Sequence, residues 1–383
     1  MVELGTLIHQ AKIVRCGEGD YPILSMTMHD GLVFQNDKFN KTIASKDRSD
    51  YKVVNRNQLV ISFPIDEGVL AAQRIVDAGI VSPAYGIWDI NQELILPEFL
   101  EYALRCDRAL SYYKAKLRGS TARRRSLPTP TLLAYTVPLP DISEQEHILN
   151  VVHKTQKVIS GRTEEISLLD NLIKARFVGL FGNPVSNPKG WNVEPLGKRC
   201  GIITGNTPSR SEPENYGKYI EWIKSDNINT PFTFITKAQE CLSEAGFGKC
   251  RFVEAGSILM TCIAGSINCI GNVAVTDRRV AFNQQINAIV PEQDEVLYLY
   301  WLMQLSKPMI HRTINMALKG ILSKSQLSEM AFPFPPITLQ KQFAAFVEQT
   351  DKSKVIEAIY KTNTLFNITL SGGSRYDIRA NEF

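Results

Sequence analysis

The longest regular pattern of apolar positions in this 383-residue chain has the heptad spacing of a coiled coil. Five apolar residues recur at intervals of seven: Val152, Ile159, Ile166, Ile173 and Leu180. Gly161 and Arg162 interrupt this face, and Gly182-Asn183-Pro184 supplies the residues that end a helix. We therefore predict an imperfect coiled-coil helix over about residues 143–181, which needs another helix as its partner.

The stretch that begins this helix occurs twice. Pro138-Leu139-Pro140 precedes Ser143, and Pro333-Phe334-Pro335 precedes Thr338. Each hydroxyl residue stands at an expected N-cap, and Glu146 has the capping-box spacing from Ser143. The second apolar face is rougher and uses Phe343, Val347, Thr350, Ile356, Ile359 and Phe366. Two ordinary core helices would explain the apolar faces, but not the repeat or a helix of about forty residues.

Short alternating or apolar runs before each long helix predict mixed α/β domains. In the first unit, residues 21–27 and 59–63 are expected strands, and a helix is expected from Leu100 to Lys116. The second unit repeats this order, with strands at 256–262 and 282–289 and a helix at 297–305. The expected fold class is α/β (α+β), with two globular domains joined by two long antiparallel coiled-coil helices in an internal pseudo-twofold repeat. The expected boundaries are domains 1–137 and 184–332, long helices 138–183 and 333–370, and a tail 371–383.

Composition excludes only a few classes of protein. The net charge of +4 permits an anionic partner without requiring one. The sequence has neither a secretory signal nor an apolar run of about twenty residues, so we expect a cytoplasmic protein without a membrane partner. The seven cysteines are scattered and form no C-x-x-C pair, and the histidines do not cluster. We therefore expect neither a disulfide framework nor a metal site.

Basic residues gather on a loop after the expected helix of the first domain. Residues 118–126 contain four arginines beside glycine, serine and threonine, and residues 318–324 form a shorter basic loop at the matching place in the second domain. Such side chains neutralise DNA phosphates, and arginine also recognises guanine in the major groove. A solvated loop is the alternative for either run. Their equivalent positions favour DNA binding.

Motifs for catalysis are missing from the sequence. Phe334-Pro335-Pro336-Ile337 lacks the asparagine of the N-P-P-[YF] tetrapeptide of adenine methyltransferases. Gly248-Lys249 lacks the first glycine and the hydroxyl residue of a phosphate-binding loop. We therefore expect a non-catalytic protein that binds no cofactor of its own. An enzyme with an unfamiliar site is an open alternative.

The order of several short motifs resembles the specificity subunits of type I restriction-modification systems. These motifs are the repeated Pro-x-Pro entry with Glu144-Gln145, and residues 79–85, 119–121, 204–210, 221–226 and 283–285. The resemblance implies two target recognition domains, each binding one half of a split site in double-stranded DNA. It also implies helices that set the spacing and dock methyltransferase subunits, together with restriction/translocase subunits. S-adenosylmethionine and ATP with magnesium would belong to those partners.

The resemblance and the basic loops together give the candidate site residues. Candidates for DNA binding are Arg118, Ser120, Thr121, Arg123, Arg124, Arg125, Thr207, Arg210, Lys224, Arg278, Arg279, Lys319 and Lys324. Candidates for docking partner subunits are Glu144, Gln145, Ile148, Gln340 and Phe343.

The two copies also differ from each other. The Gly-x-Thr-Pro-Ser sequence of the second domain is missing from the first, which predicts different half-sites and an asymmetric target. Leu339 stands where the first copy has Glu144, so the two docking sites are not identical. A helix over 143–181 would span about 58 Å, the length of about 17 base pairs. A scaffold whose two lobes bind proteins instead of DNA is the main alternative.

Overall fold

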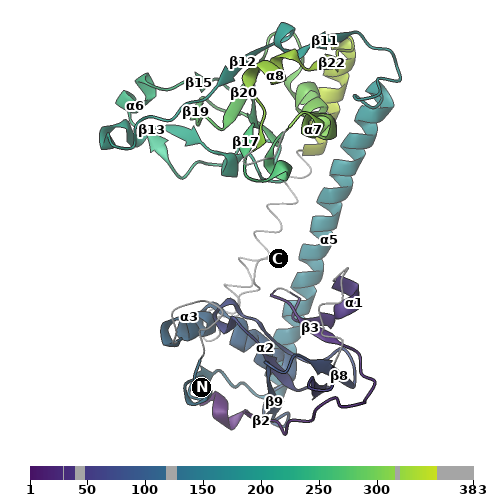
Figure 1. Cartoon of the computed structure of the whole chain (residues 1–383), viewed down its shortest axis with the longest axis vertical. Coiled ribbons are helices and arrows are strands. Elements are labelled where there is room, and N and C mark those ends of the chain that lie inside the picture. Colours follow the sequence, from purple (N-terminus) through teal and green to yellow (C-terminus); the bar gives the residue numbers. More distant parts are fainter. Residues whose placement is uncertain (29, 39–47, 118–126, 315–319, 352–383) are drawn as a thin grey trace. The chain divides into compact units, whose positions relative to one another are not determined.

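The computed structural model describes residues 1–28, 30–38, 48–117, 127–314 and 320–351 (Figure 1). The chain divides into two compact units, Met1–Thr163 and, within the described part, residues 164–351. The expected mixture of helices and strands is confirmed. The expected tail 371–383 and the second long helix beyond residue 351 lie outside the described residues.

Unit 1 is built around a four-stranded antiparallel sheet in the order β2-β9-β6-β7. Helix α2 buries Phe99, Leu100 and Leu104 in the main core of this unit, which also includes strand residues. The predicted single helix from Leu100 to Lys116 is wrong in one respect, because extended backbone at Cys106 separates α2 from α3. The strands and helices before α5 are β1 (Val2–Glu3), β2 (Ile8–Gln10), β3 (Leu24–Met26), β4 (Leu32–Phe34), α1 (Gln35–Lys38), β5 (Lys52–Asn55), β6 (Leu59–Ile61), β7 (Leu70–Ala72), β8 (Ala78–Val81), β9 (Gly86–Ile90), α2 (Pro97–Arg105), α3 (Asp107–Lys116), α4 (Thr129–Leu133) and β10 (Thr136–Val137).

Unit 2 contains a corresponding antiparallel sheet in the order β12-β20-β16-β18, and a second sheet in the order β14-β13-β19-β15. Helix α7 lies in the same unit as these sheets (Figure 1). Its apolar residues form one core with the first of the two sheets. Its strands and α-helices after α5 are β11 (Val193–Pro195), β12 (Cys200–Thr204), β13 (Tyr216–Ile223), β14 (Cys241–Leu242), α6 (Glu244–Gly248), β15 (Phe252–Val253), β16 (Ile258–Thr261), β17 (Ile263–Ala264), β18 (Val273–Val275), β19 (Val280–Phe282), β20 (Ile286–Pro291), α7 (Val296–Arg312), β21 (Gly320–Ile321), α8 (Lys324–Glu329) and β22 (Ala331–Pro333).

The two units repeat one plan. In each, a short strand pair joins a strand that precedes the four-stranded sheet to a strand at the Pro-x-Pro entry, β1 with β10 and β11 with β22. The first strand of each pair, β1 or β11, is followed by one turn of 3-10 helix, Leu4–Thr6 or Leu196–Lys198. The first strand of the four-stranded sheet comes next. The repeated order of elements agrees with the repeated sequence pattern.

Helix α5 (Ile142–Phe181) is a single helix of 40 residues. Its N-cap is Asp141, whose Oδ1 accepts a hydrogen bond from the backbone N–H of Glu144 at 2.8 Å. The expected caps Ser143 and Thr338 are therefore wrong, because both residues lie inside helices; the second helix already includes residue 337 and is described to 351.

The second half of α5 packs against the second helix within unit 2. Phe177 and Phe181 contact Phe343, with ring centroids 5.4 and 5.6 Å apart, and Ile173 and Val347 belong to the same core. Of the five predicted seam residues, Ile173 is buried in this core and Leu180 packs against it. Among the described residues, no helix combines the length and apolar character needed to cross a membrane.

Candidate nucleic-acid interface

Several of the candidate DNA-binding residues belong to segments that the structure does not describe. These are Arg118, Ser120, Thr121, Arg123, Arg124, Arg125 and Lys319. Lys324 is described and exposed at the first position of α8. Ser323 caps this helix and forms a capping box with Gln326. The local sequence therefore determines that the helix begins at Lys324.

The loop after β12 approaches the sheet so closely that only glycine fits at position 205. A Cβ atom on Gly205 would overlap the carbonyl oxygens of Phe282 and Asn283. The loop is held at this close approach by two backbone hydrogen bonds, from Gly205 to Ile286 at 3.0 Å and from Asn206 to Phe282 at 3.1 Å. The Gly-Asn-Thr-Pro-Ser sequence is therefore a loop packed onto the end of the sheet.

Polar side chains connect this loop to its neighbours. Thr207 is exposed, and its hydroxyl contacts the side chain of Gln284. The side chain of Asn206 donates to the carbonyl of Lys249 and accepts from the backbone of Arg251, each at 2.8 Å. Arg251 in turn donates to the carbonyl of Thr204 at 2.7 Å. An ordered edge of polar and basic groups results.

Arg210 and Lys224 meet at one carboxylate on this edge. Arg210 donates two hydrogen bonds to Glu240, at 2.9 and 3.2 Å, and the ammonium group of Lys224 contacts the same side chain. Both cations also lie over the ring of Trp222, 5.7 and 5.3 Å from its centroid, and Arg210 lies 5.1 Å from the centroid of Tyr216. Two candidate residues are therefore brought together. Trp222 lies in the motif 221–226 but was not named as a site residue, and Glu240 was missed because it belongs to no motif in the sequence.

Arg278 and Arg279 have different surroundings. Arg278 donates to both carboxylate oxygens of Glu221, at 2.9 and 2.7 Å, and to the carbonyl of Thr236 at 3.2 Å. This pairing with Arg278 lowers the pKa of Glu221 below its ordinary value. Arg279 donates to Glu254 at 2.8 Å. Both arginines are satisfied within the chain, so the structure offers no support for assigning them to DNA.

Three of the five candidate docking residues are buried in the chain's own interior. Gln145, Gln340 and Phe343 have no exposed surface. Assigning these three to direct partner contact is therefore corrected, since a partner subunit has no access to them in this structure. Glu144 is exposed and Ile148 is partly buried, so both remain candidates.

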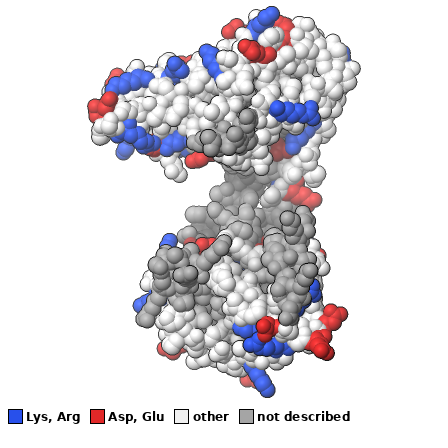
Figure 2. Space-filling view, viewed as in Figure 1, with Lys and Arg blue, Asp and Glu red and all other residues white. Residues whose placement is uncertain are grey.

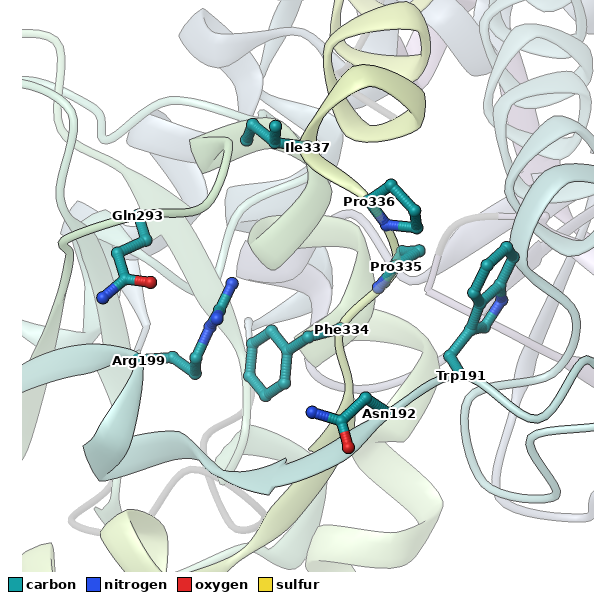
Figure 3. Close-up of a pocket in the computed structure, with 8 residues that line it drawn as sticks. All are labelled: Trp191, Asn192, Arg199, Gln293, Phe334, Pro335, Pro336 and Ile337. Carbon is teal, nitrogen blue, oxygen red and sulfur yellow. The ribbon is translucent and has the colours of Figure 1, made fainter.

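A pocket of about 540 Å³ lies beside the second Pro-x-Pro entry (Figure 3). Its lining consists of Trp191, Asn192, Arg199, Gln293, Phe334, Pro335, Pro336 and Ile337. The guanidinium of Arg199 is committed to Asp294, to which it donates at 2.8 and 2.9 Å, and it lies 4.9 Å from the centroid of Phe334. The described residues contain no cluster of three or more side chains suited to hold a metal ion.

Comparisons with known proteins show what this chain is similar to. Residues 188–365 match the family model described as "Type I restriction modification DNA specificity domain". Over 299 residues the chain is 23% identical to the type I restriction enzyme HindI specificity subunit of Haemophilus influenzae, a match that covers 58% of this chain and 64% of that protein, slightly less than two thirds of its length. The resemblance to type I specificity subunits is thus confirmed.

Two solved structures have a fold similar to that of this chain. The S subunit of a type I restriction-modification system from M. genitalium is 14% identical with a TM-score of 0.55, and the match covers 96% of this chain and 93% of that one. A chain from a structural study of complex assembly and conformational transition of the type I R-M system is 17% identical with a TM-score of 0.52, covering 96% and 95%. At these identities the likeness concerns the fold.

Proposed function

We propose that this chain is the DNA sequence-recognition subunit of a type I restriction-modification complex. The observation that carries the proposal is the match of residues 188–365 to a DNA specificity domain, in a chain whose first unit repeats the order of elements of the second. Each unit would recognise one half of a split site in double-stranded DNA, as two copies of one plan would be expected to do.

The loops after the first strands of the two sheets support recognition of different half-sites. In unit 2 this loop is the Gly205 loop packed onto Phe282 and Asn283. The corresponding loop of unit 1 follows β2 and lacks the Gly-x-Thr-Pro-Ser sequence. Binding residues lie disproportionately on loops, so different loops support an asymmetric target.

The long helices would connect the recognition units and dock methyltransferase subunits. Helix α5 has 40 residues, about 60 Å at the usual rise of about 1.5 Å per residue. Glu144 and Ile148, near its start, are the accessible candidates for the methyltransferase contact. Catalysis would belong to partner subunits: the methyltransferase would use S-adenosylmethionine and the restriction/translocase subunit would use ATP with magnesium. The complex would act in the cytoplasm.

Co-expression with the cognate methyltransferase subunit tests this function. Methylated adenines would be mapped across the genome of the host strain by single-molecule sequencing, with and without this chain. We expect a split, asymmetric motif that disappears when this chain is omitted. A stable complex that produces no methylation would contradict the DNA-recognition role and would favour a protein-binding scaffold. Methylation or cleavage by this chain alone would show that it is an enzyme.

A further inference from the structure

The ion pairs of unit 2 differ in how many cations share each carboxylate. Four cations in the described part of this unit, Arg199, Lys249, Arg278 and Arg279, each contact carboxylates that form no ion pair with a second described cation. Glu240 differs, because two cations, Arg210 and Lys224, share this one carboxylate. This cluster carries a net charge of about +1 at neutral pH, since arginine and lysine are both charged there.

The cluster is open to solvent and rests on a rigid base. The side chain of Arg210 is 60% exposed, whereas Trp222 below it is only 3% exposed. The indole of Trp222 donates to the carbonyl of Asn206 at 3.4 Å, and the backbone N–H of Lys224 donates to Asn227 at 3.1 Å. The backbone that carries Lys224 is therefore held in place, which reduces the entropy lost when a ligand binds.

Neighbouring groups add to the positive charge of the edge. Arg251, which is exposed, is tied through Asn206 to the same loop. Figure 2 shows lysine and arginine side chains, with acidic side chains among them, at the end of unit 2 where α6 and β13 lie in Figure 1. A monoanion placed at the Arg210 and Lys224 pair would balance the surplus charge, whereas the other ion pairs have no surplus to balance.

We infer that Arg210 and Lys224 bind a backbone phosphate of DNA and that Glu240 holds the two cations in position when DNA is absent. This inference rests on the proposed function, because it presumes that unit 2 binds DNA. A phosphate carries no sequence information, so the pair orients the unit on the duplex while other side chains recognise bases. Arg278 and Arg279 stabilise the unit and take no part in this contact.

The test uses the full chain in complex with its methyltransferase subunit. Binding is measured at several salt concentrations to two fluorescent duplexes, one with the mapped motif and one with both half-sites scrambled. Arg210→Gln and Lys224→Gln are each expected to weaken binding to both duplexes by the same factor. The slope of log affinity against log salt concentration should become shallower by about 0.9 for each DNA phosphate that the variant no longer neutralises.

Two further variants distinguish the loss of a phosphate contact from a loss of structure. Glu240→Gln removes the competing carboxylate and is expected to tighten binding to both duplexes, a direction that loss of structure would not produce. Arg279→Gln is the matched control and should leave affinity and slope unchanged. Thermal unfolding of each variant checks that it is folded.

Other outcomes would overturn the inference. Weaker binding by Arg210→Gln and Lys224→Gln to the motif duplex alone would make the pair a base contact. Unchanged affinity would make the cluster purely structural. In either case wild-type complex would still bind DNA, and the proposed function would stand. A wild-type complex that binds neither duplex would overturn the proposed function itself, and this inference with it.

Discussion

The side-chain amide of Gln340 donates a hydrogen bond to the buried carboxylate of Asp294, with 2.7 Å between Nε2 and Oδ1. The same amide donates to the carbonyl of Pro335 at 2.9 Å and accepts from the backbone of Glu295 at 2.9 Å. Glu295 is the N-cap residue of α7. Gln340 thus joins the Pro-x-Pro entry of the second long helix to the start of another helix.

Gln145 does the same in unit 1. Its amide donates to the carbonyls of Leu94 and Pro140, each at 2.9 Å, and accepts from the backbone of Leu96, the N-cap residue of α2, at 2.8 Å. Gln145→Ala removes all three hydrogen bonds of a side chain that has no exposed surface. We expect a loss of about 1–3 kcal/mol in the free energy of unfolding, measured in urea.

The exposed neighbour provides the control for this prediction. Glu144→Ala is expected to change the free energy of unfolding by less than about 0.5 kcal/mol, as is usual for surface positions. If Gln145→Ala released the methyltransferase subunit while its unfolding stayed the same, Gln145 would be a docking residue after all.

An ion pair in unit 2 replaces an apolar pair in unit 1. Arg199 and Leu7 each come just before the first sheet strand, and Asp294 and Ile95 each come just before the N-cap of the following helix. Leu7, Ile95 and the side chain of Asp294 are fully buried. Arg199→Leu should cost about 3–5 kcal/mol, because it leaves a buried carboxylate without a counter-charge, with only the hydrogen bond from Gln340 remaining.

The double variant Arg199→Leu with Asp294→Ile copies the apolar pair of unit 1. We expect it to recover most of the stability lost by Arg199→Leu, since apolar replacement of a buried ion pair is often neutral. Chemical denaturation of the four members of this mutant cycle measures the recovery. Equal losses in the single and double variants would show that the two sites are not equivalent.

Phe177 links α5 to unit 2. Its ring stacks on Tyr298 with centroids 5.5 Å apart, and it is 1% exposed. Phe177→Ala should lower the free energy of unfolding by about 3–5 kcal/mol through lost burial and a cavity. Val178, the next residue, is 45% exposed, and Val178→Ala should have little effect in the same denaturation experiment. Similar losses for the two variants would contradict the observed packing.

The Glu221–Arg278 pair predicts how stability depends on pH. Hydrogen bonding to Arg278 lowers the pKa of Glu221 in the folded chain. The ion pair therefore stabilises the fold fully at pH values above the pKa that Glu221 has in the unfolded chain. This stabilisation disappears as the pH falls through the lower pKa that Glu221 has in the folded chain. Glu221→Gln should be less stable than wild type at pH 7, and this difference should shrink as the solution is acidified. Thermal unfolding across this acidic range measures it, and a constant difference would contradict the assignment.

Much of the fold could be predicted, because local helix signals are strong in this sequence and the same pattern occurs twice. The heptads from Val152 to Leu180 predicted α5 closely, and the recurring Pro-x-Pro predicted a second helix, which is described over residues 337–351. The cap was misplaced because Asp141 and Ser143 both have side chains that can cap a helix, and only the backbone decides between them. Gln145 shares its helical face with Leu149 and Val152, at spacings of four and three, and this pattern could have indicated its burial.

The candidate site was harder to predict, because ion pairing joins residues far apart in the sequence. Arg278 and Arg210 look equally basic in the sequence. Their difference depends on Glu221, 57 residues from Arg278, and on a carboxylate at position 240 that two cations share. Charge in the sequence therefore predicted a basic surface but not which of its cations remain available to DNA.

The most direct test of the central claim is to replace residues 184–332 with the corresponding segment of a known type I specificity subunit, and to map the methylated motif again. If each unit recognises one half-site, one half of the split motif will change to that of the donor and the other half will stay as it was. If both halves change, or if the complete original motif persists, then the units do not recognise separate half-sites and the account is wrong.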